Sequence, residues 1–87
     1  MILGQAGFAQ PGVIRGTVMD AQTKKPIAKV NIFIQGTRSG TVSNVAGVFR
    51  LPDRFSAADT VVFSHIGYRL FKCSVEALRA HPTIMLH

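Results

Sequence analysis

The sequence lacks the residues that would hold a small domain together covalently or through a metal. Cys73 is the only cysteine, so the chain forms no internal disulfide and offers no cysteine pair for a zinc site. We assign Cys73 the role of a small buried hydrophobe, the usual state of a free cysteine. The absence of a disulfide does not decide the compartment, because many exported bacterial domains fold without one.

Acidic residues are also scarce. Ten Lys and Arg residues stand against four Asp and Glu residues, and the resulting net charge of +6 favours an anionic partner such as nucleic acid, an acidic glycan or a phospholipid surface. Apart from Lys24 and Lys25, however, the basic residues are dispersed, and no aromatic residues alternate with them as a stacking platform. The pattern is more typical of solvated sheet faces. It predicts no specific nucleic-acid binding and leaves a glycan open.

Long apolar runs are absent as well. Hydrophobic residues make up 47% of the chain, too many for a disordered protein, but Gly, Pro and charged residues interrupt every stretch that could span a membrane as a helix. A chain of 87 residues has room for one hydrophobic core, and so small a domain is commonly stabilised by contact with a neighbouring domain or protein. We therefore expect one domain over residues 12–87, with an adjoining domain or partner.

Residues 1–11 are predicted to be a leader outside that domain. Gly7 and Ala9 are small residues at the positions that a signal peptidase requires before its cut, but no basic residue precedes them. The segment is thus either the remnant of an export signal or a flexible leader, and both interpretations stay open.

The dominant pattern is the alternation typical of β-strands. Val30, Ile32 and Ile34 recur at every second position, which places them on one face of an extended chain. Comparable segments predict about seven short strands, an all-β sandwich in which the first two pair antiparallel and the very hydrophobic 60–64 lies centrally. The expected strands are 13–20, 27–35, 37–43, 48–51, 60–64, 68–74 and 83–87. Good helix formers after a possible Ser74 cap predict one or two helical turns near 75–80.

Two turns contain the residues that we single out for structural roles. Asn44 can accept a backbone hydrogen bond from two residues on, and Gly47 can adopt the positive φ that closes such a turn. We prefer this to a calcium site, because no set of carboxylates surrounds Asn44. Gly67 offers a bulge or turn. Tyr68 is expected to begin a strand, bury its ring and bond its hydroxyl to a loop carbonyl, rather than to bind a substrate.

The three histidines do not indicate an active site. His65, His81 and His87 fall on three different elements, and no carboxylate near them in the sequence could orient a ring. Catalysis and metal binding need convergent groups, so we predict no catalytic, cofactor-binding or metal-binding residue and no cofactor.

Several short motifs follow one another in a characteristic order. They are Gly16-Thr17-Val18-Met19-Asp20, Lys25-Pro26-Ile27-Ala28-Lys29-Val30-Asn31-Ile32, Gly36-Thr37, Gly40-Thr41-Val42-Ser43-Asn44, Gly47-Val48-Phe49 and Phe63-Ser64-His65-Ile66-Gly67-Tyr68. As a set, over residues 13–86, they resemble the carboxypeptidase regulatory-like domain found at the N-terminus of many TonB-dependent outer-membrane receptors of Bacteroidetes-type bacteria. Asn44 stands where that family usually has Asp, and both residues make the same backbone bond.

The resemblance implies a seven-stranded antiparallel Greek-key sandwich of the transthyretin (prealbumin) type. It implies export to the periplasm, outer membrane or cell surface, and a noncatalytic accessory role in binding, interaction or spacing beside a protein partner or adjoining domain. The sequence stops at His87, and we expect it to be either a fragment of a longer receptor or a domain that acts alone. The sequence predicts no oligomeric state.

An alternative function is that of the transthyretin-like 5-hydroxyisourate hydrolases, which share the general sandwich. That chemistry requires convergent His and Arg groups and, in that family, a terminal segment of the Tyr-Arg-Gly-Ser type. Residues 83–87 lack this segment, so we favour the noncatalytic role.

Overall fold

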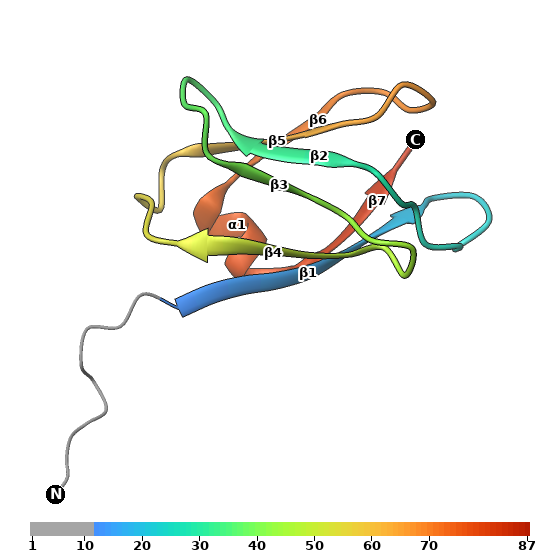
Figure 1. Cartoon of the computed structure of the whole chain (residues 1–87), viewed down its shortest axis with the longest axis horizontal. Coiled ribbons are helices and arrows are strands. Elements are labelled where there is room, and N and C mark those ends of the chain that lie inside the picture. Colours follow the sequence, from blue (N-terminus) through green and yellow to red (C-terminus); the bar gives the residue numbers. More distant parts are fainter. Residues whose placement is uncertain (1–11) are drawn as a thin grey trace, which may run out of the picture.

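The computed structural model describes residues 12–87, which form two β-sheets in separate layers with one short helix at an end (Figure 1). In chain order the elements are β1 (Gly12–Asp20), β2 (Asn31–Ile34), β3 (Gly40–Val42), β4 (Val48–Asp53), β5 (Thr60–Ser64), β6 (Phe71–Ser74), α1 (Val75–Ala80) and β7 (Thr83–Leu86). These elements confirm the predicted all-β sandwich with a short helix near residues 75–80. The leader predicted at residues 1–11 lies outside the described residues.

One sheet has the strand order β4-β1-β7 and the other β3-β2-β5-β6. The hydrophobic strand β5 is an inner strand, as its composition predicts. The expected antiparallel pairing of the first two strands is wrong. β1 and β2 belong to different sheets, and the isolated bridge from Met19 of β1 reaches Pro26, which precedes β2 in the chain. Alternation predicts that a segment is a strand, but it does not say which sheet the strand enters.

The outer strand β7 runs parallel to β1, with Thr17 opposite Thr83 in the register. The expectation of a wholly antiparallel sandwich therefore fails at this pair, whereas the other strand pairs are antiparallel. The entire second sheet lies between β1 and β7 in the chain, which supplies the long crossover that parallel pairing needs. As a consequence, β1 begins at one end of the sandwich and β7 finishes at the other (Figure 1).

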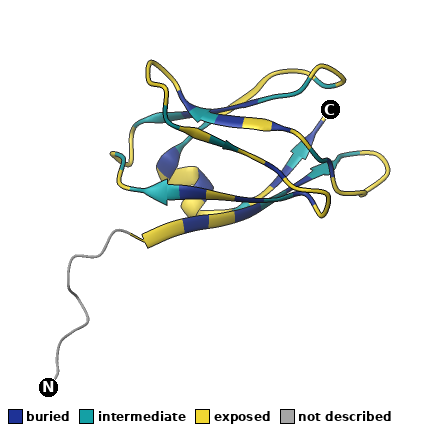
Figure 2. Cartoon of the chain, in the orientation of Figure 1, coloured by how far each residue is buried: buried dark blue, intermediate teal, exposed yellow. Residues whose placement is uncertain are grey.

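The core lies between the two sheets, where the buried bands of neighbouring strands face each other (Figure 2). Val30, Ile32 and Ile34 are all buried, so the predicted apolar face is confirmed. Phe49 from the first sheet meets Phe63 from the second edge to face, with ring centroids 5.6 Å apart. Each such buried side chain stabilises the fold by about 1.5–3 kcal/mol.

Ser43 is a buried polar residue whose bonds fix the entry to β2. Its Oγ accepts a hydrogen bond from the Val30 N–H at 2.9 Å and donates one to the Ile27 carbonyl at 2.8 Å. Three buried polar groups are thereby satisfied at once, as burial in an apolar core requires.

Helix α1 closes the end of the sandwich at which β1 begins. Its N-cap is Ser74, as predicted, and the Ser74 Oγ accepts from the Ala77 N–H at 3.0 Å. Val75 and Leu78 enter the core, and Arg79 forms a 2.6 Å ion pair with Asp53 of β4. Within residues 12–87, α1 included, no helix has the length and apolar character to cross a membrane.

Candidate functional site

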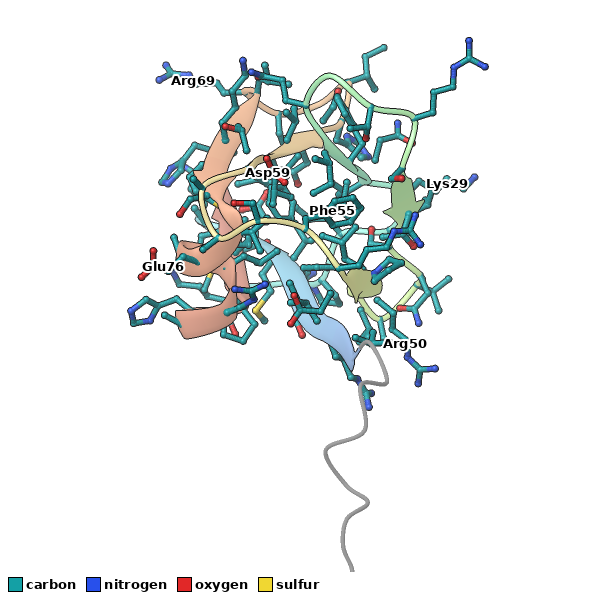
Figure 3. The ribbon with its side chains drawn as sticks, turned by 90° about the vertical axis from the view of Figure 1, so that its left-hand side faces the viewer. Lys29, Arg50, Phe55, Asp59, Arg69 and Glu76 are labelled. Atoms are coloured by element: carbon teal, nitrogen blue, oxygen red, sulfur yellow. The ribbon has the colours of Figure 1, made fainter. Side chains whose placement is uncertain are left out.

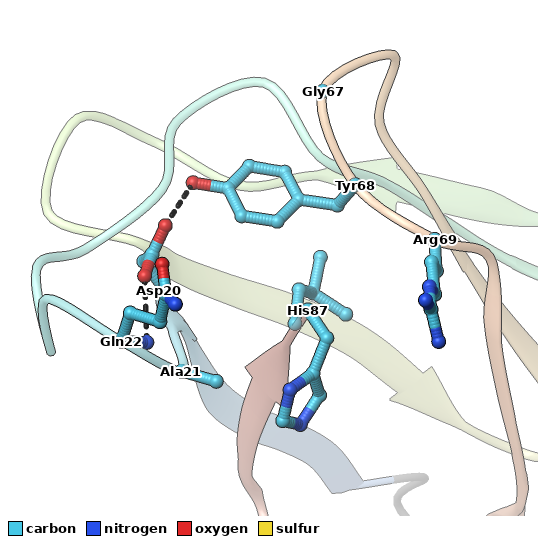
Figure 4. A pocket seen from close by; sticks show the side chains of 8 residues that line it. Asp20, Ala21, Gln22, Gly67, Tyr68, Arg69 and His87 are labelled. Atoms are coloured by element: carbon cyan, nitrogen blue, oxygen red, sulfur yellow. Dashed lines mark hydrogen bonds between the residues drawn. The ribbon is translucent and has the colours of Figure 1, made fainter.

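A polar pocket of about 420 Å³ (Figure 4) opens where β1 ends, at the end of the sandwich opposite α1 (Figure 1). It lies where β1 ends, where the turn after β5 folds over, and where β7 finishes. Its polar side chains are those of Asp20, Gln22, Tyr68, Arg69 and His87. The parallel β1–β7 pair places Asp20 opposite Leu86, and the Arg69 N–H donates to the His87 carbonyl at 2.7 Å, which holds the turn after β5 beside them.

The pocket is organised by a hydrogen bond between Tyr68 and Asp20. The Tyr68 hydroxyl donates to Asp20 Oδ2 at 2.7 Å, while Asp20 Oδ1 accepts from the backbone N–H groups of Gln22 at 2.7 Å and Thr23 at 2.9 Å. The acceptor is thus a carboxylate and not the loop carbonyl that the sequence led us to expect. Tyr68 also precedes β6, which begins at Phe71, instead of beginning it. Its ring is half-buried against the core.

These bonds move the pKa values of both groups further from neutral pH. The backbone N–H of Thr23, then the Tyr68 hydroxyl and the N–H of Gln22, lower the pKa of Asp20 below its usual value. The bond to Asp20 raises the pKa of Tyr68. At neutral pH the carboxyl is therefore charged and the phenol protonated, which suits a structural tie better than a general base or a nucleophile.

The histidines lie around this region without converging. The His65 Nδ1 accepts the Gly67 N–H at 3.0 Å, and its ring meets Tyr68 with centroids 5.3 Å apart. His81 caps α1 at the other end, and His87 alone of the three lines the pocket. In the described part of the chain, no group of three or more His, Cys, Asp or Glu side chains is arranged to hold a metal ion. Gly67 has no positive φ.

The other predicted turn connects β3 to β4 and does not line this pocket. Asn44 Oδ1 accepts from the N–H groups of Ala46 at 2.9 Å and Val48 at 3.0 Å, and Gly47 adopts a φ of 75°. A Cβ on Gly47 would lie 2.5 Å from the Val18 carbonyl oxygen, so the Gly47 backbone packs closely against β1. The four singled-out residues therefore serve two separate turns.

Sequence reasoning missed Asp20, Arg69 and His87 as pocket residues. Asp20 had a local signal, because an Asp followed by a short polar loop commonly accepts backbone bonds from the next residues. Its bond to Tyr68 had none, since 48 positions separate the two residues. The two residues meet because β1 pairs with β7, and because the Arg69 N–H next to Tyr68 donates to the His87 carbonyl just after β7 at 2.7 Å.

A known protein family matches nearly all of the described residues. The sequence profile of the CarboxypepD_reg-like domain matches residues 14–86, from β1 to the end of β7. The chain belongs to the CarboxypepD_reg-like domain family. The resemblance drawn from short motifs is thereby confirmed, and the match includes α1 and the pocket residues Asp20, Tyr68 and Arg69.

Relatives of this CarboxypepD_reg-like domain include two TonB-dependent proteins. The chain is 36% identical over 62 residues to the TonB-dependent receptor SusC of Bacteroides thetaiotaomicron, covering 71% of the chain and 6% of the receptor. It is 30% identical over 92 aligned residues to the TonB-dependent transporter Oar of Myxococcus xanthus, covering 100% of the chain and 9% of the transporter. The chain thus spans only a small part of either relative. No solved structure matches it significantly.

Proposed function

We propose that this CarboxypepD_reg-like domain is a noncatalytic accessory module of the cell envelope, joined to or associated with an outer-membrane TonB-dependent receptor. The observation that carries the proposal is the similarity to two TonB-dependent proteins from two different bacteria, over 71% and 100% of the chain. The corresponding location is the periplasm, the outer membrane or the cell surface. The role is binding, interaction or spacing beside a protein partner or adjoining domain.

The direction of the strands supports a spacing role, in which the domain lies between a preceding and a following segment. β1 has nine residues and begins at one end of the sandwich, while β7 runs parallel to it and finishes at the other. Segments attached before β1 and after β7 would be separated by roughly the length of β1, about 25 Å. A rigid sandwich would hold that spacing.

The bonds of the carboxylates support the absence of catalysis. Asp20 is held by Tyr68 and its own loop, Asp53 by Arg79, and Asp59 accepts from the Ser56 N–H at 2.9 Å. Glu76, the remaining acidic residue of the chain, stands exposed in the first turn of α1. General acid–base chemistry needs convergent groups with adjusted pKa values, and these carboxylates are dispersed over the fold in structural roles.

The test is an in-frame removal of residues 12–87 from the chromosomal gene, compared with a replacement by a flexible linker of similar reach. We expect the level of the associated TonB-dependent receptor in the outer membrane to stay unchanged, while uptake of its substrate falls. Recovery of uptake by the linker indicates spacing, and its failure indicates binding. Unchanged uptake in the deletion strain would contradict the proposal.

A further inference from the structure

A second concavity, of about 540 Å³, lies on the side of the sandwich where β3 and β4 come near each other. β3 is the edge strand of one sheet and β4 the edge strand of the other, so an exposed strand edge borders the concavity from each sheet. We name it the β3–β4 cleft. Its wall contains Thr41 and Val42 from β3, Val48 and Arg50 from β4, and Arg15 from β1.

Arg15 and Arg50 stand directly opposite each other in the β1–β4 register, and both are exposed. The Thr17 N–H donates to Pro82 on the β7 side, so the backbone groups of Arg15, two residues away, also point away from β4. Arg15 and Arg50 therefore form a non-hydrogen-bonded pair, in which the Cα atoms are only about 4.5 Å apart and the side chains are closest. The two arginine side chains therefore start from one small area of the surface.

No carboxylate of the domain offsets this charge. The cleft contains no Asp or Glu, and within residues 12–87 the one ion pair joins Arg79 to Asp53. The leader 1–11 contributes no charged residue either. Like charges directly opposite each other across two strands are destabilising. The pair is therefore unfavourable in the free domain and becomes favourable when an anion lies against it.

The strand edge supplies backbone groups beside the two arginines. Val48 points its N–H and C=O away from β1, because both bond to Asn44 in the turn. Backbone groups alternate along a strand, so those of Arg50 also point to the outer edge, beyond the reach of that turn. Val42, 52% exposed, adds an apolar surface on the facing strand. An extended peptide can bind at such an edge. It would use the unpaired backbone groups for hydrogen bonds, the apolar surface for a side-chain contact and the cationic pair for its charges.

We propose that the β3–β4 cleft binds an extended acidic segment of a partner protein, with carboxylates of that segment paired to Arg15 and Arg50. A membrane surface fits less well, because it would need the basic residues to share one broad face. Figure 3 shows Arg50 and Arg69 on opposite sides of the domain. The inference rests on the proposed binding role, since it names the kind of partner that such a module would hold.

The test uses the purified chain and a synthetic peptide of alternating glutamate and threonine, with an alternating glutamine and threonine peptide as the neutral counterpart. Titration calorimetry measures the affinity for wild type, Arg15→Gln, Arg50→Gln and the control Lys25→Gln, which removes an exposed positive charge from the β1–β2 loop. We expect the glutamate peptide to bind, each arginine substitution to weaken it about tenfold, and Lys25→Gln to leave it unchanged. The amide resonances of Val42 and Arg50 should shift on binding.

Three results would overturn the inference. Equal binding of the neutral peptide would remove the role of carboxylates, and an equal loss in Lys25→Gln would reduce the effect to net charge. Retention on phosphatidylglycerol vesicles that depends on Arg15 and Arg50, without peptide binding, would assign the pair to lipid headgroups. Any of these leaves the receptor association standing, because that proposal is tested separately by uptake in cells. The arginine side chains are exposed, so circular dichroism should show the same fold in every variant.

Discussion

The hydroxyl of Tyr68 donates a 2.7 Å hydrogen bond to the carboxylate of Asp20, across 48 positions of sequence. Asp20 ends β1 in one sheet, and Tyr68 follows β5 in the other. The bond therefore ties the two layers together at the end of the sandwich that α1 does not cover. Tyr68 is also the only tyrosine of the chain, so its ionisation can be observed without interference.

The first prediction concerns this ionisation. The bond to Asp20 raises the pKa of Tyr68, so the tyrosinate absorbance should appear with a midpoint above the ordinary value of about 10. In Asp20→Asn the negative acceptor is lost, and the midpoint should return toward the ordinary value. Identical titration curves for wild type and Asp20→Asn would contradict the tie.

The same pair predicts how stability depends on pH. The pKa of Asp20 is lower in the folded than in the unfolded chain, so its contribution is present above the unfolded value of about 3.9 and is lost as the pH falls through the folded pKa. The melting temperature of wild type should therefore drop in acid more steeply than that of Asp20→Asn. For Tyr68 the folded pKa is raised, so its contribution is lost as the pH rises through that value. Parallel melting curves against pH for the two proteins would rule out the linkage.

Substitutions at three glycines distinguish the energetic cost of a positive φ from the cost of a steric contact. Gly36 and Gly47 both have a positive φ, but an added Cβ meets open space at Gly36 and the Val18 carbonyl at Gly47. Gly36→Ala should lower the free energy of unfolding by about 1 kcal/mol, and Gly47→Ala by more than about 2 kcal/mol. Gly67→Ala should change it by less than about 0.5 kcal/mol, because its φ is not positive and nothing lies closer than 3.5 Å. Urea denaturation measures all three, and equal losses at Gly36 and Gly47 would refute the contact with β1.

Ser43 gives a test of the buried polar cluster. Ser43→Ala leaves the Val30 N–H without the Oγ acceptor and the Ile27 carbonyl without the Oγ donor. We expect a loss of about 1–3 kcal/mol in the free energy of unfolding. Ser39→Ala is the matched control, because the Ser39 Oγ accepts only an exposed 3.2 Å bond from Arg54. Similar losses for both variants would show that the burial of Ser43 has no energetic consequence.

The strands were predictable because local alternation carries the signal. Val30, Ile32 and Ile34 share a face in any sheet they enter, and the Ser74 cap of α1 is likewise encoded within a few residues. Pairing is not encoded locally. The assignment of β1 to the sheet of β4 and β7 depends on packing over the whole chain, and it decides that Arg15 faces Arg50 and that Asp20 meets Tyr68. Both concavities therefore escaped prediction although every strand that forms them was expected.

The facing arginines also predict an effect on stability. Replacing Arg50 by Gln should raise the free energy of unfolding by roughly 0.5 kcal/mol at low ionic strength, because it removes the like-charge repulsion with Arg15. The gain should fade as salt screens the pair. Chemical denaturation at two salt concentrations checks this, with Lys25→Gln as the control. A destabilised Arg50→Gln would mean that the pair is not repulsive in the free domain.

The central claim is that this CarboxypepD_reg-like domain works in the cell envelope beside a TonB-dependent receptor. The most direct measurement is fractionation of the native cells, followed by affinity isolation of the polypeptide that carries residues 12–87 and identification of what comes with it. The account predicts an envelope fraction in which this sequence is part of, or co-purifies with, a TonB-dependent receptor. Recovery from the cytosol without a receptor, together with turnover of 5-hydroxyisourate by the purified chain, would contradict it.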